Sequence, residues 1–114
     1  MGREGYRGEF EQMLLLAALR LGNDAYGVAL RQRIKKTTGN ALPYGTLYFI
    51  LDQLTRKAYV TRYAGESDSD RGGRPRIYYT LTSKGHQALE FAYEMQQKVW
   101  DGYAEKTWGE ETEK

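Results

Sequence analysis

The stretch LPYGTLYFILDQLTRKAYV, from Leu42 to Val60, decides how the rest of the chain can be organised. Its apolar residues recur at spacings of four, three and four, which places them on one helical face that we expect to be buried: Leu47, Leu51, Leu54 and Ala58. The other face is neutral, aromatic or hydroxyl-bearing: Tyr44, Thr46, Phe49 and Gln53. Neutral donors, acceptors and methyl groups can read base edges in a DNA groove. Most helices with this pattern are only amphipathic surface helices, so the surrounding sequence has to decide.

The composition indicates one globular domain. The 114 residues are 40% hydrophobic and 28% charged, which suits a single core. Cysteine is absent, which excludes a disulfide scaffold and thiolate zinc sites and fits a reducing compartment. No apolar run is long enough to span a membrane, and the first residues lack the apolar core of a signal peptide. We therefore expect a cytoplasmic protein without a membrane partner.

Charge is unevenly distributed along the chain. Residues 1–82 hold 13 Lys and Arg against 8 Asp and Glu, a balance of +5, whereas residues 83–114 hold 4 against 7, a balance of −3. A basic body with an acidic tail favours a polyanionic partner for the body. An ordinary solvated surface without a partner is the alternative.

Two helices are predicted before the quoted stretch. We assign no structure to residues 1–8. The run EFEQMLLLAALRLG, from Glu9 to Gly22, is apolar on almost every side, so its helix needs burial on two sides, one of which could be a second subunit. Gly22 can end this helix, and Asn23 or Asp24 can cap the next.

The second helix, AYGVALRQRIKKTTG, ends in a cluster of cations. Tyr26, Leu30 and Ile34 are expected to face inward. Cations near a helix C-terminus interact favourably with the helix dipole, which explains the cluster without any partner. Phosphate contact by one or more of its four cations, Arg31, Arg33, Lys35 and Lys36, is the alternative, and Lys35 or Lys36 is the expected contact.

A hairpin with a basic tip follows the quoted stretch. Residues 59–64 and 76–82 are rich in β-branched and aromatic residues and predict two antiparallel strands. The loop GESDSDRGGRP between them places Arg71, Arg74 and Arg76 around Gly72 and Gly73. Guanidinium groups on such a tip suit phosphate or minor-groove contact. A solvated hairpin end is the alternative, and the acidic half of the loop lacks the ligand pattern of an EF-hand, so no metal site is expected.

A long last helix is predicted from a Thr82 or Ser83 cap to about Trp108. At 1.5 Å per residue it would span about 39 Å and project from the domain. Its apolar seam predicts a partner helix, and the aromatic side chains beside the seam could instead line a cleft for a planar ligand. The residues concerned are Leu89, Ala92, Tyr93, Gln96, Val99, Trp100 and Tyr103. The acidic end of the chain is expected without regular structure.

The predicted fold is mainly α with a small β-hairpin, a winged helix-turn-helix followed by a long C-terminal dimerisation helix. The chain resembles the PadR-like transcriptional regulators from about Leu14 to Tyr93. The motifs that carry the resemblance are AYGVAL (25–30), YGTLYFILDQL (44–54) and GGRPRIYYTLTSKG (72–85). The single C-terminal helix resembles the short subfamily.

The resemblance implies a homodimeric repressor that binds a palindromic operator in double-stranded DNA. The helix from Tyr44 would enter the major groove and the wing would contact the backbone or minor groove. In many relatives a small aromatic or multidrug-like ligand between protomers releases the DNA. Residues 1–82 would form the DNA-binding domain, and residues 83–114 the dimerisation helix and acidic tail. From the residue patterns and the resemblance together, the expected DNA-binding residues are Lys35, Lys36, Tyr44, Gly45, Thr46, Tyr48, Arg71, Gly72, Gly73, Arg74 and Arg76.

The chain departs from the family pattern at several positions. Pro43 stands where relatives usually have a capping Ser, and Ala58 occupies a turn usually given to Gly. Phe49 is bulkier than the usual residue, and Gln96 stands where multidrug-binding relatives have an aromatic residue. Pro43 bears on the helix cap and on one phosphate contact, and Gln96 bears on the ligand site.

Other functional classes fit the sequence less well. An enzyme is not expected, because the chain has no cysteine, no phosphate-binding glycine motif and a single histidine, His86, without a nearby partner for acid–base or metal chemistry. No cofactor is expected. A ligand-sensing or protein-interaction module that uses the winged fold without reading DNA is the alternative to a DNA-binding regulator.

Overall fold

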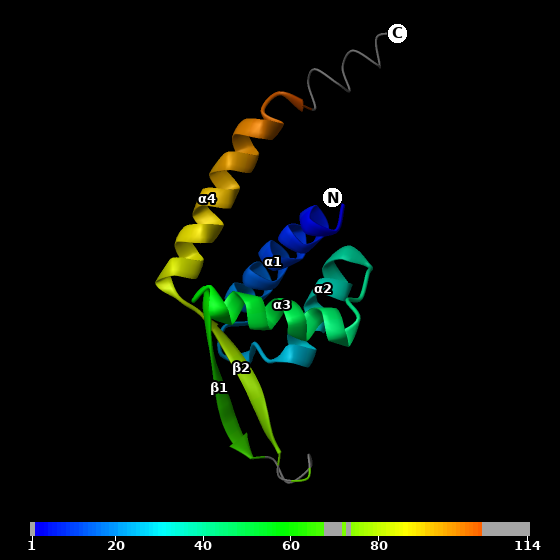
Figure 1. The fold of residues 1–114 in the computed structure, drawn as a ribbon, viewed down its shortest axis with the longest axis vertical. Helices are drawn as coiled ribbons and strands as arrows, with labels where there is room; N and C mark the ends of the chain where they lie inside the picture. Colours follow the sequence, from blue (N-terminus) through cyan, green and yellow to red (C-terminus); the bar gives the residue numbers. More distant parts are fainter. Residues whose placement is uncertain (1, 68–71, 73, 104–114) are drawn as a thin grey trace.

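The computed structural model describes residues 2–67, 72 and 74–103 (Figure 1). Over these residues the chain is mainly helical with one two-stranded antiparallel hairpin, which confirms the predicted fold class. The elements in order are α1 (Gly2–Leu21), the 3-10 turn η1 (Gly22–Asp24), α2 (Gly27–Thr38), α3 (Tyr44–Arg56), β1 (Val60–Ser67), β2 (Pro75–Leu81) and α4 (Ser83–Trp100). None of the helices in this part of the chain is long and apolar enough to cross a membrane.

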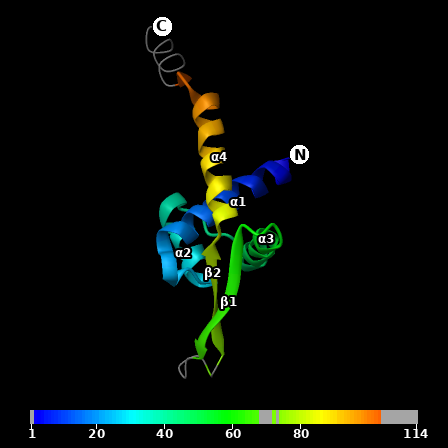
Figure 2. The same cartoon turned by 90° about the vertical axis from the view of Figure 1, so that its left-hand side faces the viewer.

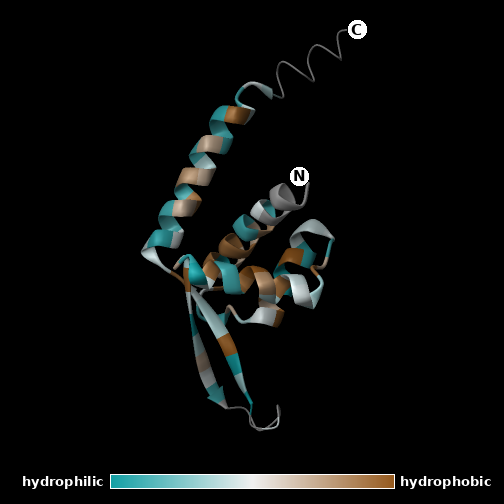
Figure 3. Cartoon of the chain, viewed as in Figure 1, coloured by the Kyte–Doolittle hydropathy of each residue, from teal (hydrophilic) through white to brown (hydrophobic). Residues whose placement is uncertain are grey.

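The core lies where α1, α2 and α3 meet, and apolar colouring concentrates there in Figure 3. From α3 it takes Leu47, Leu51 and Leu54, each at most 1% exposed, as their spacing predicts. The fourth predicted member, Ala58, is exposed instead. That prediction was wrong because α3 ends at Arg56 and Ala58 has a left-handed φ of 64°.

The beginning of the chain differs from expectation in two places. Helix α1 starts at Gly2 rather than near Glu9, since extending an existing helix by one residue is far easier than nucleating it. Gly22, with a φ of 58°, ends α1 as predicted. The predicted caps Asn23 and Asp24 lie within η1, and the N-cap of α2 is Tyr26, whose side chain makes no capping hydrogen bond.

The hairpin is anchored to the start of α2. Val60 pairs with Leu81 and Ala64 with Ile77, and the register shifts between Ala64 and Ser67. The Tyr79 N–H donates to the carbonyl of Ala25 at 2.8 Å. Figure 2 shows the result: the hairpin extends from one end of the helical core and α4 from the other.

Helix α4 projects from the core, as predicted, but ends earlier. Thr82 is its N-cap, and its side-chain oxygen accepts from the Gly85 N–H at 3.0 Å. The helix stops at Trp100 instead of about Trp108, because Asp101 leaves the helical conformation and Gly102 has a φ of 74°. Residues 104–114, which include the acidic end GEETEK (109–114), lie outside the described residues. The radius of gyration of 17.2 Å exceeds the roughly 13 Å of a compact chain of this size.

Candidate nucleic-acid interface

The first turns of α3 present an exposed, largely uncharged surface. Tyr44, Tyr48 and Phe49 are 49%, 44% and 48% exposed, and Gly45 and Thr46 are exposed beside them. The face opposite the buried leucines is therefore available to a partner, as the sequence predicts. Side chains of this kind can approach base edges and thymine methyl groups without a desolvated charge.

Arg31 of α2 holds the beginning of α3 in place. Its Nε donates to the carbonyl of Leu42 at 2.6 Å, and its guanidinium lies 4.2 Å from the centre of the Tyr44 ring. The Nη1 atom is 3.4 Å from the Tyr44 hydroxyl. Pro43, the N-cap residue, supplies no side-chain cap. Arg31 thus stabilises the turn between the two helices through the Leu42 carbonyl and the Tyr44 ring.

Tyr48 joins α3 to the first turn of α2. A Cβ atom at Gly27 would lie 2.9 Å from carbon atoms of the Tyr48 ring, so only glycine lets the phenol pack this closely. Gly27, the glycine of the AYGVAL motif, is therefore the position against which the Tyr48 ring of α3 packs. Sequence reasoning identified both motifs but not their contact, because the motifs lie on different helices.

A hollow of about 380 Å³ opens between α3, the start of α2 and the hairpin. Its lining includes two arginines, two tyrosines beside Tyr48, and one carboxylate: Tyr26, Gly27, Val28, Tyr48, Asp52, Thr55, Arg62, Pro75, Arg76, Ile77 and Tyr79. Burial raises the pKa of Tyr79, an effect that Arg62 opposes and that Tyr48 and Asp52 reinforce. The hydroxyl of Tyr79 therefore stays protonated at neutral pH.

Arg76 is the wing residue most closely held by the fold. Its guanidinium stacks 4.4 Å from the centre of the Tyr26 ring, and its Nε atom is buried with no hydrogen-bond partner in the described structure. The neighbouring Tyr78 stacks on Tyr63, with the ring centres 5.6 Å apart. Aromatic contacts thus fix the base of the wing and aim one cation at the hollow.

The other predicted wing residues lie nearer the tip. Arg74 and Gly72 are exposed, and Gly72 has a φ of 71°, a conformation that favours glycine. Arg71 and Gly73 lie outside the described residues. The wing therefore contributes Arg74 and Arg76 to the described surface.

The basic end of α2 lies beside the start of α3. Lys35 and Lys36 are both exposed. Lys35 follows Arg31 by one helical turn and so shares its face of α2, whereas Lys36 lies further round the helix. Lys35 is accordingly the better placed of the two to flank a ligand at Tyr44.

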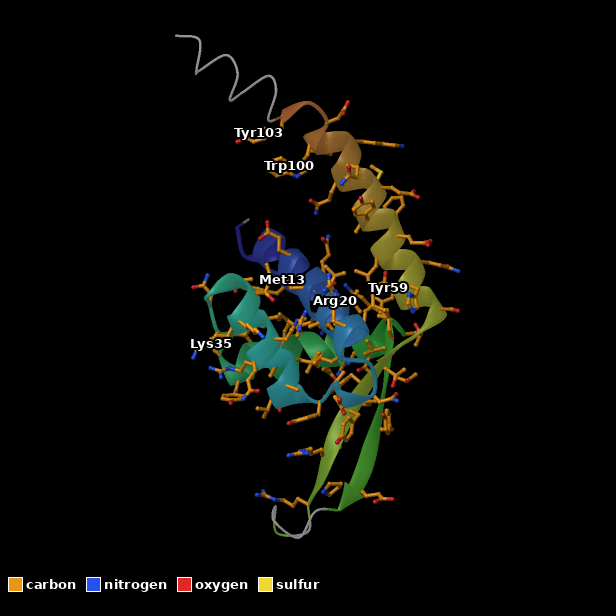
Figure 4. All side chains as sticks on the ribbon, turned by 180° about the vertical axis from the view of Figure 1, so that it is seen from behind. Met13, Arg20, Lys35, Tyr59, Trp100 and Tyr103 are labelled. Atoms are coloured by element: carbon orange, nitrogen blue, oxygen red, sulfur yellow. The ribbon has the colours of Figure 1, made fainter. Side chains whose placement is uncertain are left out.

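Helix α4 presents apolar side chains to α1 and to solvent. A second hollow, of about 360 Å³, separates α4 from α1 and is lined by Gln12, Leu16, Leu89, Ala92, Tyr93, Gln96, Gln97 and Trp100. The amide of Gln96 donates to the side chain of Gln12 at 3.3 Å. Trp100 and Tyr103 extend toward the side on which α1 lies, in edge-to-face contact at 4.9 Å (Figure 4).

Two of the predicted interface residues, Val99 and Tyr103, do not line this hollow. Two exposed apolar residues of α4, Phe91 and Met95, were not among the predicted interface residues. Val99 is 76% exposed, and Tyr103 lies beyond the end of α4. Phe91 and Met95, 64% and 43% exposed, precede Val99 at intervals of four and form a second apolar row. Their spacing could have revealed them. Among the described residues, no group of three or more His, Cys, Asp or Glu could hold a metal ion.

Solved structures share this architecture. A PadR-like transcription factor from Bacteroides fragilis is 23% identical with a TM-score of 0.76, over 93% of this chain and 97% of that one. A PadR family regulator from Eggerthella lenta is 22% identical with a TM-score of 0.66, over 90% and 88%. A protein from Streptococcus mutans is 27% identical with a TM-score of 0.62, over 83% and 89%. No curated protein sequence matches the chain.

A family model decides the assignment. The model described as the transcriptional regulator PadR-like family matches residues 15–91, which include α2, α3, the hairpin and the first half of α4. The match covers more than half of the chain. The protein therefore belongs to the PadR-like family of transcriptional regulators, which bind DNA.

Proposed function

We propose that the protein is a homodimeric repressor that binds a palindromic operator, with α3 in the major groove and the wing on the backbone or minor groove. The observation that carries the proposal is the hollow where Tyr48 of α3 meets the first turn of α2 and Arg76 of the wing. The free N–H groups of a helix start, a phenol and an arginine all donate to phosphate oxygens. A phosphate held there would place the exposed start of α3 against the adjacent groove.

Affinity and sequence preference would come from different residues. The first turns of α3 supply Tyr44, Thr46 and Tyr48 but no cation, so they contribute little Coulombic attraction. Arg74, Arg76 and Lys35 would supply the salt-dependent attraction to phosphates. On α3 itself the side chain of Arg56 pairs with Asp52 at 3.0 Å. Sequence preference would then depend on Thr46 and the tyrosines.

Dimerisation would use α1 and α4. Leu16 and Leu19 of α1 are 47% and 44% exposed, and the row Phe91, Met95 and Val99 lies exposed on α4. A second copy of the chain would bury these side chains and place two α3 helices on one face of a duplex. Half-sites about one helical turn apart, roughly 34–36 Å, would then be expected.

The test uses a duplex selected by the wild-type protein from a random pool. Binding is measured by fluorescence anisotropy at several salt concentrations. Each lost phosphate contact lowers the magnitude of the slope of log K against log salt by about 0.9. Arg76→Gln should therefore weaken DNA binding and lower the magnitude of this slope by about 0.9, the value for one contact. Lys98→Gln, an exposed charge change on α4, is the matched control and should leave both unchanged. Selection of no duplex, or an unchanged slope for Arg76→Gln, would refute the assignment.

Repression itself is tested in cells. The selected operator is placed between a promoter and a reporter gene, and wild-type protein should lower reporter output. Arg76→Gln should restore it. A rise in output on expression of the wild type would instead indicate an activator.

A second candidate function is sensing of a planar aromatic ligand at α4. The hollow between α1 and α4 has an aromatic wall, Tyr93 and Trp100, and the volume of a small-molecule site. We use proflavine as the probe, in a Trp108→Phe background so that Trp100 is the only fluorophore of its type. Saturable quenching, abolished by Tyr93→Ala, would support the site. A tight dimer without quenching would indicate a packed interface.

A further inference from the structure

A third hollow lies between α1 and α2, and it shares only Leu16 with the hollow beside α4. It measures about 200 Å³ and is lined by Met13, Leu16, Ala17 and Arg20 from α1 and by Arg33, Ile34, Thr37 and Thr38 from α2. Figure 4 shows Met13 and Arg20 along the same helix. We propose that this hollow binds a small aliphatic carboxylate, with the acyl chain between the helices and the carboxylate held by Arg20 and Arg33.

Two arginines give the hollow a positive charge, which a bound anion would neutralise. Arg20 and Arg33 come from different helices, and neither makes an ion pair or hydrogen bond with another described side chain. No carboxylate is among the lining residues. Two cations around one hollow repel each other, and a shared carboxylate would relieve that repulsion through charge-assisted hydrogen bonds.

The helix dipole accounts for only one of the two arginines. Arg20 lies in the last turn of α1, where a cation is favoured without any ligand. Arg33 lies in the middle of α2, too far from the C-terminus for this effect. Arg33 is therefore the more informative residue to change.

The lining also indicates the kind of chain. Met13, Leu16, Ala17 and Ile34 are aliphatic, and no aromatic side chain lines the hollow. The volume lies below the roughly 300–1,000 Å³ of sites for drug-sized ligands. From Met13 to Arg20 the α1 stripe extends about 10 Å, which an extended acyl chain can follow. These features separate the site from the aromatic hollow beside α4.

A ligand here would act on the DNA-binding surface through α2. Arg33 follows Arg31 by two residues, and Arg31 holds the turn that begins α3. A chain inserted between α1 and α2 would therefore displace the helix that positions Tyr44. This coupling rests on the proposed function, whereas binding to the hollow does not. By thermodynamic linkage, operator DNA and the carboxylate would change each other's affinity by the same factor.

The binding test uses sodium hexanoate as the probe and the methionine methyl groups as reporters. The full chain is labelled with ¹³C-methyl methionine. Met13 lines the hollow, and Met95 on α4 is an internal control. We expect a saturable shift of the Met13 methyl signal and no change at Met95. Uncharged hexanamide should bind at least about tenfold more weakly, the factor that corresponds to about 1.4 kcal/mol.

Variants assign the carboxylate contact. Arg33→Gln should weaken hexanoate binding about tenfold, and Lys98→Gln should not change it. Thermal melting by circular dichroism checks that each variant folds. Arg20→Gln provides the same test if Arg33→Gln is unfolded. The proposal is overturned if hexanoate produces no saturable shift at Met13, if hexanamide binds equally well, or if neither arginine variant weakens binding.

Coupling is measured separately by anisotropy on the selected duplex. At a hexanoate concentration near the wild-type dissociation constant, operator binding should weaken for wild type and much less for Arg33→Gln, whose affinity for hexanoate is about tenfold lower. If Met13 responds to hexanoate but the operator affinity does not, the site exists and the coupling to DNA is refuted. If the protein selects no duplex, the proposed function fails while the methyl titration still decides the site.

Discussion

Ala58 is strained where glycine would not be. Its φ of 64° lies in the left-handed region, which costs a non-glycine residue about 1–2 kcal/mol. Replacement by Gly relieves this strain but adds about 0.4–1 kcal/mol of unfolded-state entropy. We therefore predict that Ala58→Gly raises the free energy of unfolding by about 0.5–1 kcal/mol, measured by urea denaturation.

The control for this prediction is Ala41→Gly. Ala41 is an exposed linker residue without a positive φ, so only the entropic loss applies and stability should fall. Equal destabilisation by both substitutions would show that the turn at Ala58 is not strained.

Tyr79 makes stability dependent on alkaline pH. Burial raises its pKa in the folded state above the ordinary value near 10. The stabilisation is therefore complete below about pH 10 and is lost as the pH rises toward the folded-state pKa, because the unfolded chain ionises first. Urea unfolding above pH 10 should show a shallower fall in stability for Tyr79→Phe than for the wild type. Tyr63→Phe, which removes the hydroxyl of an exposed tyrosine, is the matched control.

At the scale of elements, α3 and the hairpin were predictable because their signals are local. Three leucines at helical spacing define the buried face of α3, and alternating side chains define β2. The end of α4 was not, because it depends on the backbone conformation of Asp101 and Gly102. At Ala58 the leucine spacing predicted burial, whereas the family resemblance indicated the turn that the structure has. The hollow beside Tyr48 could not be predicted either, since it forms only when α2, α3 and the hairpin come together.

The junction between the hairpin and α4 depends on Gly85. Gly85 is buried, and a Cβ atom there would lie against the Tyr59 carbonyl and 2.8 Å from the Leu81 Cδ1. The backbone atom cannot move aside as a flexible side chain could. We predict that Gly85→Ala lowers the free energy of unfolding by about 1–3 kcal/mol, as overpacking typically does.

Gly45→Ala is the control, because we expect it to raise the free energy of unfolding whereas Gly85→Ala lowers it. Gly45 also lies in the first turn of a helix, but a Cβ atom there would meet open space. Gly45→Ala should therefore increase stability, by up to about 1 kcal/mol, through helix propensity alone. Chemical denaturation of both variants is decisive: a neutral Gly85→Ala would mean that α4 can shift without cost.

For the whole molecule, the proposed dimer links stability, assembly and DNA binding. Helix α4 projects from the core with apolar side chains still exposed on it (Figure 1). Two weak protein–DNA contacts that act together gain affinity through effective concentration, provided that the spacing of the half-sites matches the dimer. Loss of the dimer should therefore weaken palindrome binding far more than binding to a single half-site.

Val99→Glu tests this link, because Val99 is the most exposed member of the apolar row on α4 and contacts no part of the core. A buried unpaired carboxylate is strongly unfavourable at an interface, so the dimer dissociation constant should rise at least about tenfold, or about 1.4 kcal/mol. Sedimentation equilibrium measures that constant, and the melting temperature of the monomer's core should hardly change. Lys98→Gln, the neighbouring substitution, should leave the dimer intact. If Val99→Glu remains dimeric and binds the palindrome normally, the second copy must use α1 or the inner face of α4, and the outer row serves another contact.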